Sequence, residues 1–490
     1  MKFSVLSHAC MYVEHGSSAL MIDPWLIGSA YWRSWWNFPP VDTEAIRQLR
    51  PTHIFITHIH WDHFHGPSLR YFGKDTPILI PKDRYDRMGR DLATMGFSNV
   101  IQIPHATDFE LPDGLVIRPY LFFPFTDTAL VIRSPDTTIL NANDCKIVGL
   151  PLQQILSDFP RIDFALRSHS SANTRVCYRY IGEPGEPMDD RENYVRSFCN
   201  FMRAVRPRYA VPFASNHCHL HRDTVDLNAY IQTPLDVAAY FERFREEHAL
   251  PTQLEVMLPG SSWDEDAGFH LVDTSIFVQR DRSLARYLEE KSATLESYYS
   301  LERKVRVTTE DMRRFFEPFF RTVPWLARLR FKGKPVLIIC EGGAAQASWW
   351  VDIWQNSVRE ATPDDIDRAS MRIHIPAIVL RQSLRMNMFG HAGISKRVRF
   401  LAVRSDMKRL RAFEFLLDIY EVELLPLRKN FAWRSVQAWM RRWREPLLYL
   451  HILLWLASGH KLLDFEQRLL ARTGDRRIAA QLHASHSASP

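Results

Sequence analysis

The spacing of apolar residues predicts a sheet-rich first half of the chain. Over residues 1–260, short β-branched runs bounded by turn residues alternate with stretches whose apolar positions recur every three or four residues. The short runs predict strands at 3–6, 10–13, 19–22, 53–57, 77–81, 100–104, 115–121, 129–132 and 137–141. The longer stretches predict helices at 43–49, 84–95, 191–205 and 234–247. Strands separated by helices, with several antiparallel hairpins, are typical of two sheets covered by helices.

The pattern changes after Pro259-Gly260 and the polar residues 261–266, which we interpret as the end of a first domain over 1–265. From 280 to 475, helical runs rich in Arg and Leu surround a few strands, such as 335–340 and 377–380. This predicts a mostly helical α+β C-terminal domain, which carries no motif that assigns it a role. Residues 476–490 are rich in Ala, Ser and His, and we expect a disordered tail there.

Composition narrows the class of protein. A chain of 490 residues with 46% hydrophobic and 24% charged residues is typical of a folded protein with two domains. The formal net charge of +6 comes without a dense basic run interleaved with aromatics, so no nucleic-acid partner is expected. Six cysteines without a C-x-x-C pair indicate reduced thiols, and the first residues lack a signal peptide pattern. We therefore expect a cytoplasmic protein.

One apolar run, 447–457, follows the basic and aromatic segment Arg441-Arg442-Trp443-Arg444. It is shorter than the ~18 apolar residues of a membrane span. One interpretation is a helix that packs on the body of the protein. The other is a peripheral membrane contact through 441–457, made by basic and aromatic side chains.

The chemistry of the chain concentrates in His58-Ile59-His60-Trp61-Asp62-His63, directly after a predicted strand. On a tight loop, His58 and His60 can point toward one metal, and Asp62 and His63 toward a second beside it. Imidazole and carboxylate donors suit zinc, iron or manganese, and the absence of thiolates argues against a closed structural zinc site. The motif predicts one or two divalent metal ions in an open site, and hence an enzyme. The alternative is a His-rich surface loop.

Further donors are expected at later strand ends. Asp144 closes the predicted strand 138–144 and could bridge two metals, or it could form an Asx turn. His217, His219 and His221 alternate in sequence and share one side if extended, so one can complete the site, unless they are ordinary loop histidines. His169 and His8 are weaker candidates, because such residues are more often hydrogen-bonded behind a site or in the core.

Several segments occur in the order found in a known family. They are Ser7-His8-Ala9-Cys10-Met11, Asp23-Pro24-Trp25-Leu26-Ile27-Gly28 with Trp35-Trp36 and Pro39-Pro40, the 58–63 loop, Ile139-Leu140-Asn141 with Asp144-Cys145, and Pro212-Phe213-Ala214 with His221. They resemble the metallo-β-lactamase-like module of CMP-N-acetylneuraminate hydroxylase-like proteins over roughly residues 1–260. The resemblance implies a metallo-β-lactamase-like αββα sandwich, His221 as a metal ligand, and Asp23 as a ligand or its hydrogen-bond partner. We also expect Asp62 or Asp144 to be catalytic, by orienting a metal-bound nucleophile.

The chain departs from the family in two ways. The hydroxylases carry an N-terminal Rieske domain, whose paired Cys-x-His and Cys-x-x-His ligands are missing here, so an oxygenase would need a separate ferredoxin-type electron donor. The superfamily also usually places a histidine on the strand before the bridging aspartate, and residues 120–127 contain none. Asp127, or a histidine from elsewhere, would have to replace it.

Three functions follow. The favoured one is an iron-dependent monooxygenase of a sugar, nucleotide-sugar or biosynthetic intermediate. The alternative is a hydrolase of phosphoesters, esters or amides, in which a metal lowers the pKa of bound water to about 7. The third is a non-catalytic binding protein with a degenerate site. In each case we expect a small-molecule ligand; Arg33, Trp35 and Trp36 could border it, or the two tryptophans could form a hydrophobic plug.

Overall fold

The computed structural model describes residues 1–122, 127–170, 174–183, 191–431 and 433–487. Its N-terminal half contains an eight-stranded mixed sheet with the order β19-β18-β1-β2-β3-β6-β7-β8. A seven-stranded mixed sheet with the order β17-β15-β13-β12-β11-β10-β9 lies against it. The first sheet consists of β1 (Lys2–Val5), β2 (Met11–His15), β3 (Ser18–Ile22), β6 (His53–Phe55), β7 (Ile78–Pro81), β8 (Val100–Ile103), β18 (Ser262–Asp264) and β19 (Gly268–His270). The second consists of β9 (Phe109–Glu110), β10 (Val116–Phe122), β11 (Asp127–Arg133), β12 (Thr138–Asn143), β13 (Phe164–Arg167), β15 (Tyr209–Pro212) and β17 (Gln253–Leu254).

The two sheets enclose one buried apolar layer, to which Phe3 and Leu20 contribute from the first sheet and Leu130 and Phe164 from the second. Helices bury the outer faces. On the first sheet these are α1 (Thr43–Arg47), α2 (Gly66–Leu69) and α3 (Arg87–Thr94), and on the second α4 (Leu150–Asp158), α5 (Arg191–Val205) and α6 (Pro234–Glu247). The predicted αββα sandwich is confirmed.

Local sequence explains where these helices begin. Thr233 caps α6, because its hydroxyl accepts a hydrogen bond from the backbone N–H of Asp236, whose carboxylate accepts one in return from the Thr233 N–H. Pro234 follows at the first helical position, where its missing N–H costs nothing. The same reciprocal pair, Thr308 and Asp311, begins α9 in the C-terminal half.

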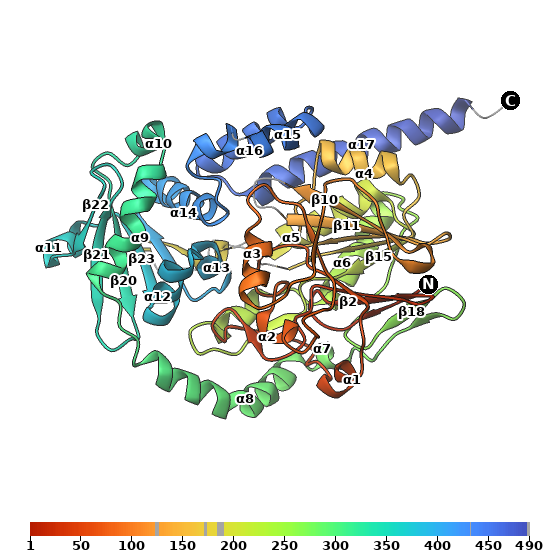
Figure 1. The fold of residues 1–490 in the computed structure, drawn as a ribbon, viewed down its shortest axis with the longest axis horizontal. Coiled ribbons are helices and arrows are strands. Elements are labelled where there is room, and N and C mark those ends of the chain that lie inside the picture. The colour runs from red at the N-terminus through yellow and green to blue at the C-terminus, as the bar shows by residue number, and fades with distance from the viewer. Residues whose placement is uncertain (123–126, 171–173, 184–190, 432, 488–490) are drawn as a thin grey trace.

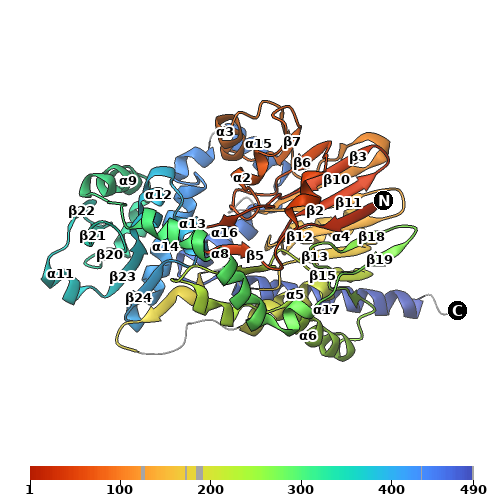
Figure 2. The ribbon, with the colours of Figure 1, turned by 90° about the horizontal axis from the view of Figure 1, so that it is seen from below.

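The C-terminal half builds a third sheet with the order β14-β24-β23-β20-β21-β22 (Figures 1 and 2). Its strands are β14 (Tyr178–Tyr180), β20 (Val336–Glu341), β21 (Ala347–Asp352), β22 (Ser357–Glu360), β23 (Met371–Pro376) and β24 (Arg399–Ala402). Its helices are α7 (Ser275–Val278), α8 (Arg280–Glu302), α9 (Thr309–Thr322), α10 (Trp325–Leu329), α11 (Pro363–Arg368), α12 (Ala377–Met386), α13 (Phe389–Ile394), α14 (Met407–Glu421), α15 (Trp433–Arg441), α16 (Pro446–Ala457) and α17 (Leu462–Ser487). The predicted helix-rich α+β character of this half is confirmed.

One sequence prediction differs from the structure here. Residues 377–380, expected as a strand, begin α12, and the strand is β23 just before them. Pro376 ends the strand and starts the helix, because it lacks the N–H that would continue the ladder. α17 continues into the predicted tail as far as Ser487, residues 488–490 lie outside the described residues, and disorder of the tail stays a prediction.

The two halves also exchange elements, which the predicted boundary between 265 and 280 did not anticipate. β14 belongs to the N-terminal half of the sequence, yet it pairs in parallel with β24, with Tyr178 opposite Phe400. In return α17 packs along α5 of the sandwich, and α8 crosses between the halves (Figures 1 and 2). A buried ion pair between Arg167 of β13 and Glu466 of α17 fastens this contact.

Strand direction brings the candidate chemistry to one edge of the sandwich. β1, β3 and β6 run in the same direction. β2 lies between β1 and β3 and is antiparallel to both, and β6 pairs in parallel with β3. Their ends lead into His8, Asp23 and the 58–63 loop. On the facing sheet β12 ends before Asp144, and its antiparallel partner β11 begins with Asp127.

Candidate metal centre

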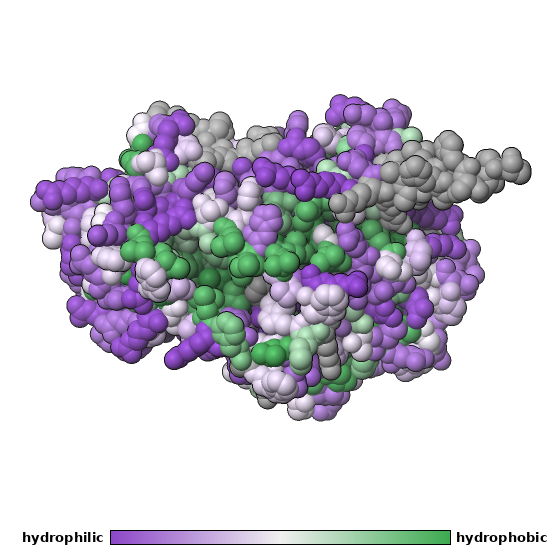
Figure 3. All heavy atoms as spheres, turned by 90° about the horizontal axis from the view of Figure 1, so that it is seen from above, coloured by the Kyte–Doolittle hydropathy of each residue, from purple (hydrophilic) through white to green (hydrophobic). Residues whose placement is uncertain are grey.

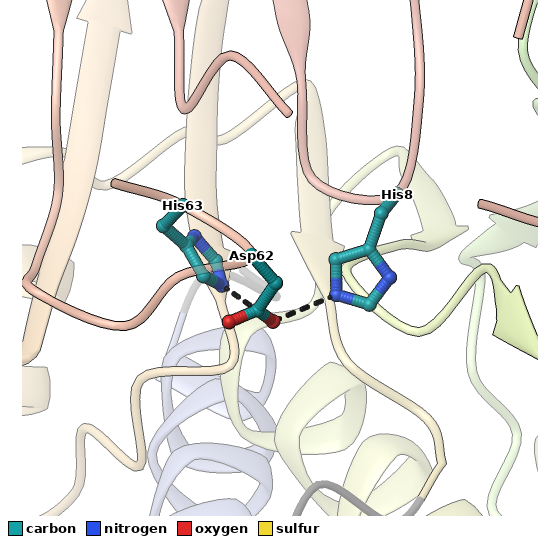
Figure 4. Close-up of side chains that lie close together, drawn as sticks. All are labelled: His8, Asp62 and His63. Carbon is teal, nitrogen blue, oxygen red and sulfur yellow. Dashed lines mark ion pairs between the residues drawn. The ribbon is translucent and has the colours of Figure 1, made fainter. Parts of the chain in front are cut away.

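Seven side chains from this edge converge on one place: His8, His58, His60, Asp62, His63, Asp127 and Asp144. The donor atoms of His58, His60 and Asp127 lie within 4.8 Å of one another, and we call this group the first triad. Those of His8, Asp62 and His63 do the same and form the second triad (Figure 4).

Asp144 lies between the two triads. Its Oδ1 is 3.6 Å from Nε2 of His58 and 3.5 Å from Nε2 of His63. In the second triad, Oδ2 of Asp62 is 3.1 Å from Nε2 of His8 and 3.5 Å from Nε2 of His63 (Figure 4). The structure therefore brings together all five residues that the sequence placed first at the site, and adds His8 and Asp127.

The donor set fits a divalent cation. Nε2 of His58, Nε2 of His63, Oδ1 of Asp127 and Oδ1 of Asp144 are buried, and none has a hydrogen-bond partner among the described residues. Buried polar atoms without a partner are costly, and a cation among them would satisfy all four. Four imidazoles and three carboxylates without a thiolate suit zinc, iron or manganese.

The charged groups of the cluster shift one another's pKa. Burial alone would lower the pKa of His63, but Asp62, Asp144 and Asp23 together raise it to about 10. Burial and the neighbouring Asp144 carboxylate raise the pKa of Asp127 well above its usual value. Burial would also raise the pKa of Asp62, yet His63 and His8 hold it well below the ordinary range. Cation binding at such a cluster displaces protons, so its affinity depends on pH.

Asp23 supports the second triad from behind. Its carboxylate accepts hydrogen bonds from the backbone N–H of Thr57 at 2.8 Å and from the Thr57 hydroxyl at 2.7 Å. The same carboxylate lies 2.7 Å from Nδ1 of His63. A proton held on Nδ1 leaves Nε2 of His63 facing the cluster as a donor to a cation. Of the two roles expected for Asp23, its position fits the hydrogen-bond partner and not the ligand.

Tyr31 and His391 also lie at the site. The sequence indicated neither as a metal ligand or its partner, although Tyr31 belongs to the aromatic segment expected to border the substrate. Tyr31 donates its phenolic hydrogen bond to Oδ1 of Asp62 at 2.5 Å. It opens a run of three left-handed residues, Tyr31, Trp32 and Arg33, with φ of 51°, 55° and 62°, a conformation that L-residues adopt only under constraint. His391 of α13 lies with its ring 5.3 Å from that of His60, between Glu421 and the carbonyl of Ile59.

His221, expected as a ligand, lies elsewhere. Its Nε2 is 3.4 Å from Oε2 of Glu302 in α8, and its ring meets Tyr299 edge-on. The reason is the path of β16 (His217–His219), which pairs antiparallel with β5 (Trp35–Asn37) and carries the chain past the cluster toward α8. His8 lies beside Asp62 and His63 instead.

His217, His219 and His169 are not among the donors of either triad. His217 stacks on Trp35 with ring centroids 3.7 Å apart, and its ring is 5.3 Å from that of His8. His219 lies 3.3 Å from the hydroxyl of Ser34. His169 is buried, and its backbone N–H donates to the hydroxyl of Ser215.

The aromatic segment proposed to border the substrate is part of the core. Trp35 is fully buried and donates its indole N–H to the carbonyl of Ile394. Trp36 is also buried, in a cluster with side chains of α8, and its indole N–H donates to the carbonyl of Arg33. Arg33 itself lies over the ring of Tyr298 and donates to Ser29. These positions agree with the alternative in which the two tryptophans form a hydrophobic plug and do not border the ligand.

A cavity of about 220 Å³ opens onto the cluster. His60, Asp62, Asp127, Asp144 and Lys146 line its metal-facing end. The C-terminal half supplies most of the rest, including Ile394, Arg411, Glu414, Phe415, Leu456 and Lys461. The donors in both triads come from the N-terminal half, but the cavity is complete only with the C-terminal half in place.

The stacked mixed sheets, the helices on their outer faces and the His/Asp cluster at the strand ends define an enzyme of the metallo-β-lactamase fold. The family model of the metallo-beta-lactamase superfamily matches residues 4–141, so the chain carries a domain of that superfamily. The predicted family is confirmed at this level.

Among curated proteins, the chain is 24% identical to a protein named as a Rieske 2Fe-2S iron-sulfur protein from Mycolicibacterium smegmatis, covering 79% of this chain and 78% of that protein. It is 31% identical to the cytidine monophosphate-N-acetylneuraminic acid hydroxylase of Xenopus laevis, covering 48% of this chain and 43% of the hydroxylase. The match to the Rieske-named protein of Mycobacterium tuberculosis H37Rv covers 54% of each. The chain thus spans about half the length of several of these relatives.

Among solved structures, the chain is similar to the CmlA beta-hydroxylase, with 16% identity, a TM-score of 0.37 and 52% of each chain covered. It is also similar to an isothiocyanate hydrolase from Delia radicum gut bacteria, with 19% identity, a TM-score of 0.36, and coverage of 54% of this chain and 99% of that one.

Proposed function

We propose that this protein is an iron-dependent monooxygenase of a compact small molecule. One observation carries the proposal: each triad combines two histidines with one carboxylate, and Asp144 lies between them. Two histidines and one carboxylate with open positions are the donor set typical of non-haem iron oxygenases. The relatives named as hydroxylases support the same assignment.

Asp127 is the residue that most favours iron. It stands where the superfamily usually has a histidine, so the first triad has one more hard oxygen donor and one fewer imidazole. Oxygen donors shift the preference of a site away from zinc and toward metals such as iron and manganese. The third carboxylate also adds negative charge, which would stabilise a higher oxidation state of the metal.

The chain's own residues hold and shield the centre. Asp23 and Tyr31 fix the orientation of His63 and Asp62. Ile394, Phe415 and Leu456 present apolar side chains to the cavity and limit access of water. Iron held by the donors of the triads would supply the activation of O₂, and electrons would come from a separate ferredoxin-type donor.

The cavity favours a compact substrate over a nucleotide-sugar. Its volume of about 220 Å³ is below the ~300–1,000 Å³ of pockets for drug-sized ligands. Lys146, Arg411 and Lys461 line it together with Glu414, Asp418 and Glu421. Burial lowers the pKa of Lys146 to about 8, with Arg167 acting in the same direction, and Lys461 is paired with Glu414 at 2.7 Å. A compact, polar sugar or biosynthetic intermediate fits this mixed lining.

Metal content and O₂ dependence test the proposal. Protein produced with iron and purified without O₂ should retain one iron for each triad, and its optical spectrum should change when O₂ is admitted. The variant Asp127→His should lose this response, whereas Asp163→His, at a buried aspartate remote from the site, should keep it. Tightly held zinc together with phosphodiesterase or esterase activity would establish the hydrolase instead. Failure to hold any metal would favour a binding protein.

A further inference from the structure

Three helices of the C-terminal half leave large apolar side chains exposed on one face. α10 exposes Trp325 and Leu326, and the segment from α15 to α16 exposes Trp443, Leu447, Leu450 and Leu454. Trp443 is 69% exposed, Leu447 80% and Leu454 62%. We call this surface the α10–α16 ridge. Single exposed apolar residues are ordinary, but a contiguous set of this kind marks an interaction surface.

The two parts of the ridge meet at one point. Arg330, just after α10, donates hydrogen bonds to the carbonyls of Ala457 and Ser458, so the C-terminal end of α10 lies against the C-terminal end of α16. All three helices lie along the top of Figure 1, and Figure 3 shows apolar side chains gathered across the middle of that face with polar ones around them.

α16 is apolar on both sides, but only one side is covered. Leu447, Leu450 and Leu454 are spaced by three or four residues and form the exposed stripe. Tyr449, Ile452 and Leu456 form the buried stripe, and Leu456 lines the catalytic cavity. A surface helix normally carries polar residues on its outer side, so this one is built to be covered.

The charge around the ridge indicates what covers it. Residues 427–457 contain six Arg and Lys residues and a single acid, Glu445. That acid is buried and already accepts hydrogen bonds from Arg442 and Tyr449. Arg428, Lys429 and Arg444 are exposed. Exposed Trp and Leu side chains with a basic border are typical of segments that lie in the headgroup region of anionic membranes.

We infer that the α10–α16 ridge docks on the surface of an anionic lipid bilayer. In the part of the chain that the structure describes, no helix is long and apolar enough to cross one, so the contact is peripheral. Docking would place α16 between the bilayer and the cavity that Leu456 lines. The inference does not depend on whether the centre is an oxygenase or a hydrolase.

Vesicle co-sedimentation of the full chain tests the docking. The protein should sediment with phosphatidylcholine vesicles that contain phosphatidylglycerol, and much less with phosphatidylcholine alone. The variant Trp443→Ser/Leu447→Ser/Leu454→Ser should reduce partitioning at least ~tenfold, because it removes large side chains that would enter the interface. A control, Leu271→Ser/Val278→Ser/Leu301→Ser, removes apolar side chains exposed elsewhere and should bind like the wild type.

A charge variant keeps the test valid if the apolar variant does not fold. Arg428→Gln/Lys429→Gln/Arg444→Gln should weaken binding to anionic vesicles and reduce its sensitivity to salt. The docking is wrong if the wild type stays in the supernatant with every vesicle, or if the ridge and control variants bind alike. It is also wrong if light scattering finds a dimer that the ridge variant dissociates while vesicles bind neither protein, since a second copy would then cover the ridge.

Discussion

The two triads have the same donor types, but their surroundings differ. In the second triad, Asp23 lies behind His63, Tyr31 donates to Asp62, and the backbone N–H of His8 donates to Asn37. In the first triad, within the part of the chain that the structure describes, only His58 has such support, from the Thr57 hydroxyl at 3.0 Å. His60 and Asp127 of the first triad line the cavity, whereas Asp62 alone does so from the second. The second triad is therefore held more firmly by the fold, and the first presents more of its donors to the cavity.

This difference assigns separate tasks to the two triads. Hydrogen bonds behind a metal ligand fix its orientation and strengthen binding of the metal. The second triad should therefore hold its metal more tightly, and the first should govern the encounter with substrate.

Replacement of Asp144 should have the largest effect. Its Oδ1 is within 3.6 Å of a histidine nitrogen from each triad, so Asp144→Ala should reduce metal occupancy at both. Loss of supporting groups behind ligands costs ~10–100-fold in affinity, and the loss of a shared donor should cost at least as much. Metal analysis and circular dichroism of the purified variant would measure this. A folded variant that keeps a full complement of metal would show that Asp144 is not shared.

The second prediction separates the triads. Asp127→Ala should lower metal content by one ion per chain, and His8→Ala should do the same through the other triad. The two variants should differ in activity, because only Asp127 lines the cavity while His8 lies behind it. Metal titration followed by calorimetry, with a substrate-analogue titration in parallel, would measure both effects. If either substitution empties both sites, the triads act as one unit and the comparison fails.

Much of this arrangement was predictable, because it is local. The loop after β6 and the end of β12 directed attention to His58, His60, Asp62, His63 and Asp144, and the missing strand histidine directed it to Asp127. The sequence did not predict that His8, and not His221, lies beside Asp62 and His63, because their positions depend on the path of the chain through β16. Contacts between residues far apart in the sequence could not be predicted either. For example, His391 contacts the carbonyl of Ile59, which lies 332 residues before it.

The same limit applied to the fold. Alternating apolar runs predicted the two sheets of the sandwich. Successive side chains of a strand point to opposite faces of the sheet, so the sequence shows which face is buried. Nothing in the local pattern of 178–180 indicates that β14 joins the C-terminal sheet. The pairing of Arg167 with Glu466 is likewise a tertiary event, visible only once α17 is placed against the sandwich.

A smaller effect is expected from the support of the second triad. Asp23→Asn removes the charge behind His63 and should lower metal affinity of the second triad by ~10–100-fold, with little change at the first. Competition with a chromophoric chelator would resolve the two affinities. Asp163→Asn is the matched control, because Asp163 is also buried and accepts from a backbone N–H, that of Thr138, but lies far along the sheet from the cluster. Equal losses in both variants would mean that Asp23 acts on stability alone.

The smallest effect on metal should come from His221, which the family resemblance implied to be a ligand. His221→Gln should leave metal content unchanged, because the ring faces Glu302 and not either triad. Burial lowers the pKa of His221, so the ring is neutral near pH 7, and its loss removes the hydrogen bond that Nδ1 accepts from the backbone N–H of Asp223. Glu302 keeps its ion pair with Arg397, which in turn binds Asp223. The free energy of unfolding should therefore fall by only ~1–2 kcal/mol, the usual cost of one buried hydrogen bond. Denaturant unfolding beside metal analysis would separate the two readouts. A loss of one metal ion with unchanged stability would restore His221 as a ligand and show that His8 is not the donor beside Asp62.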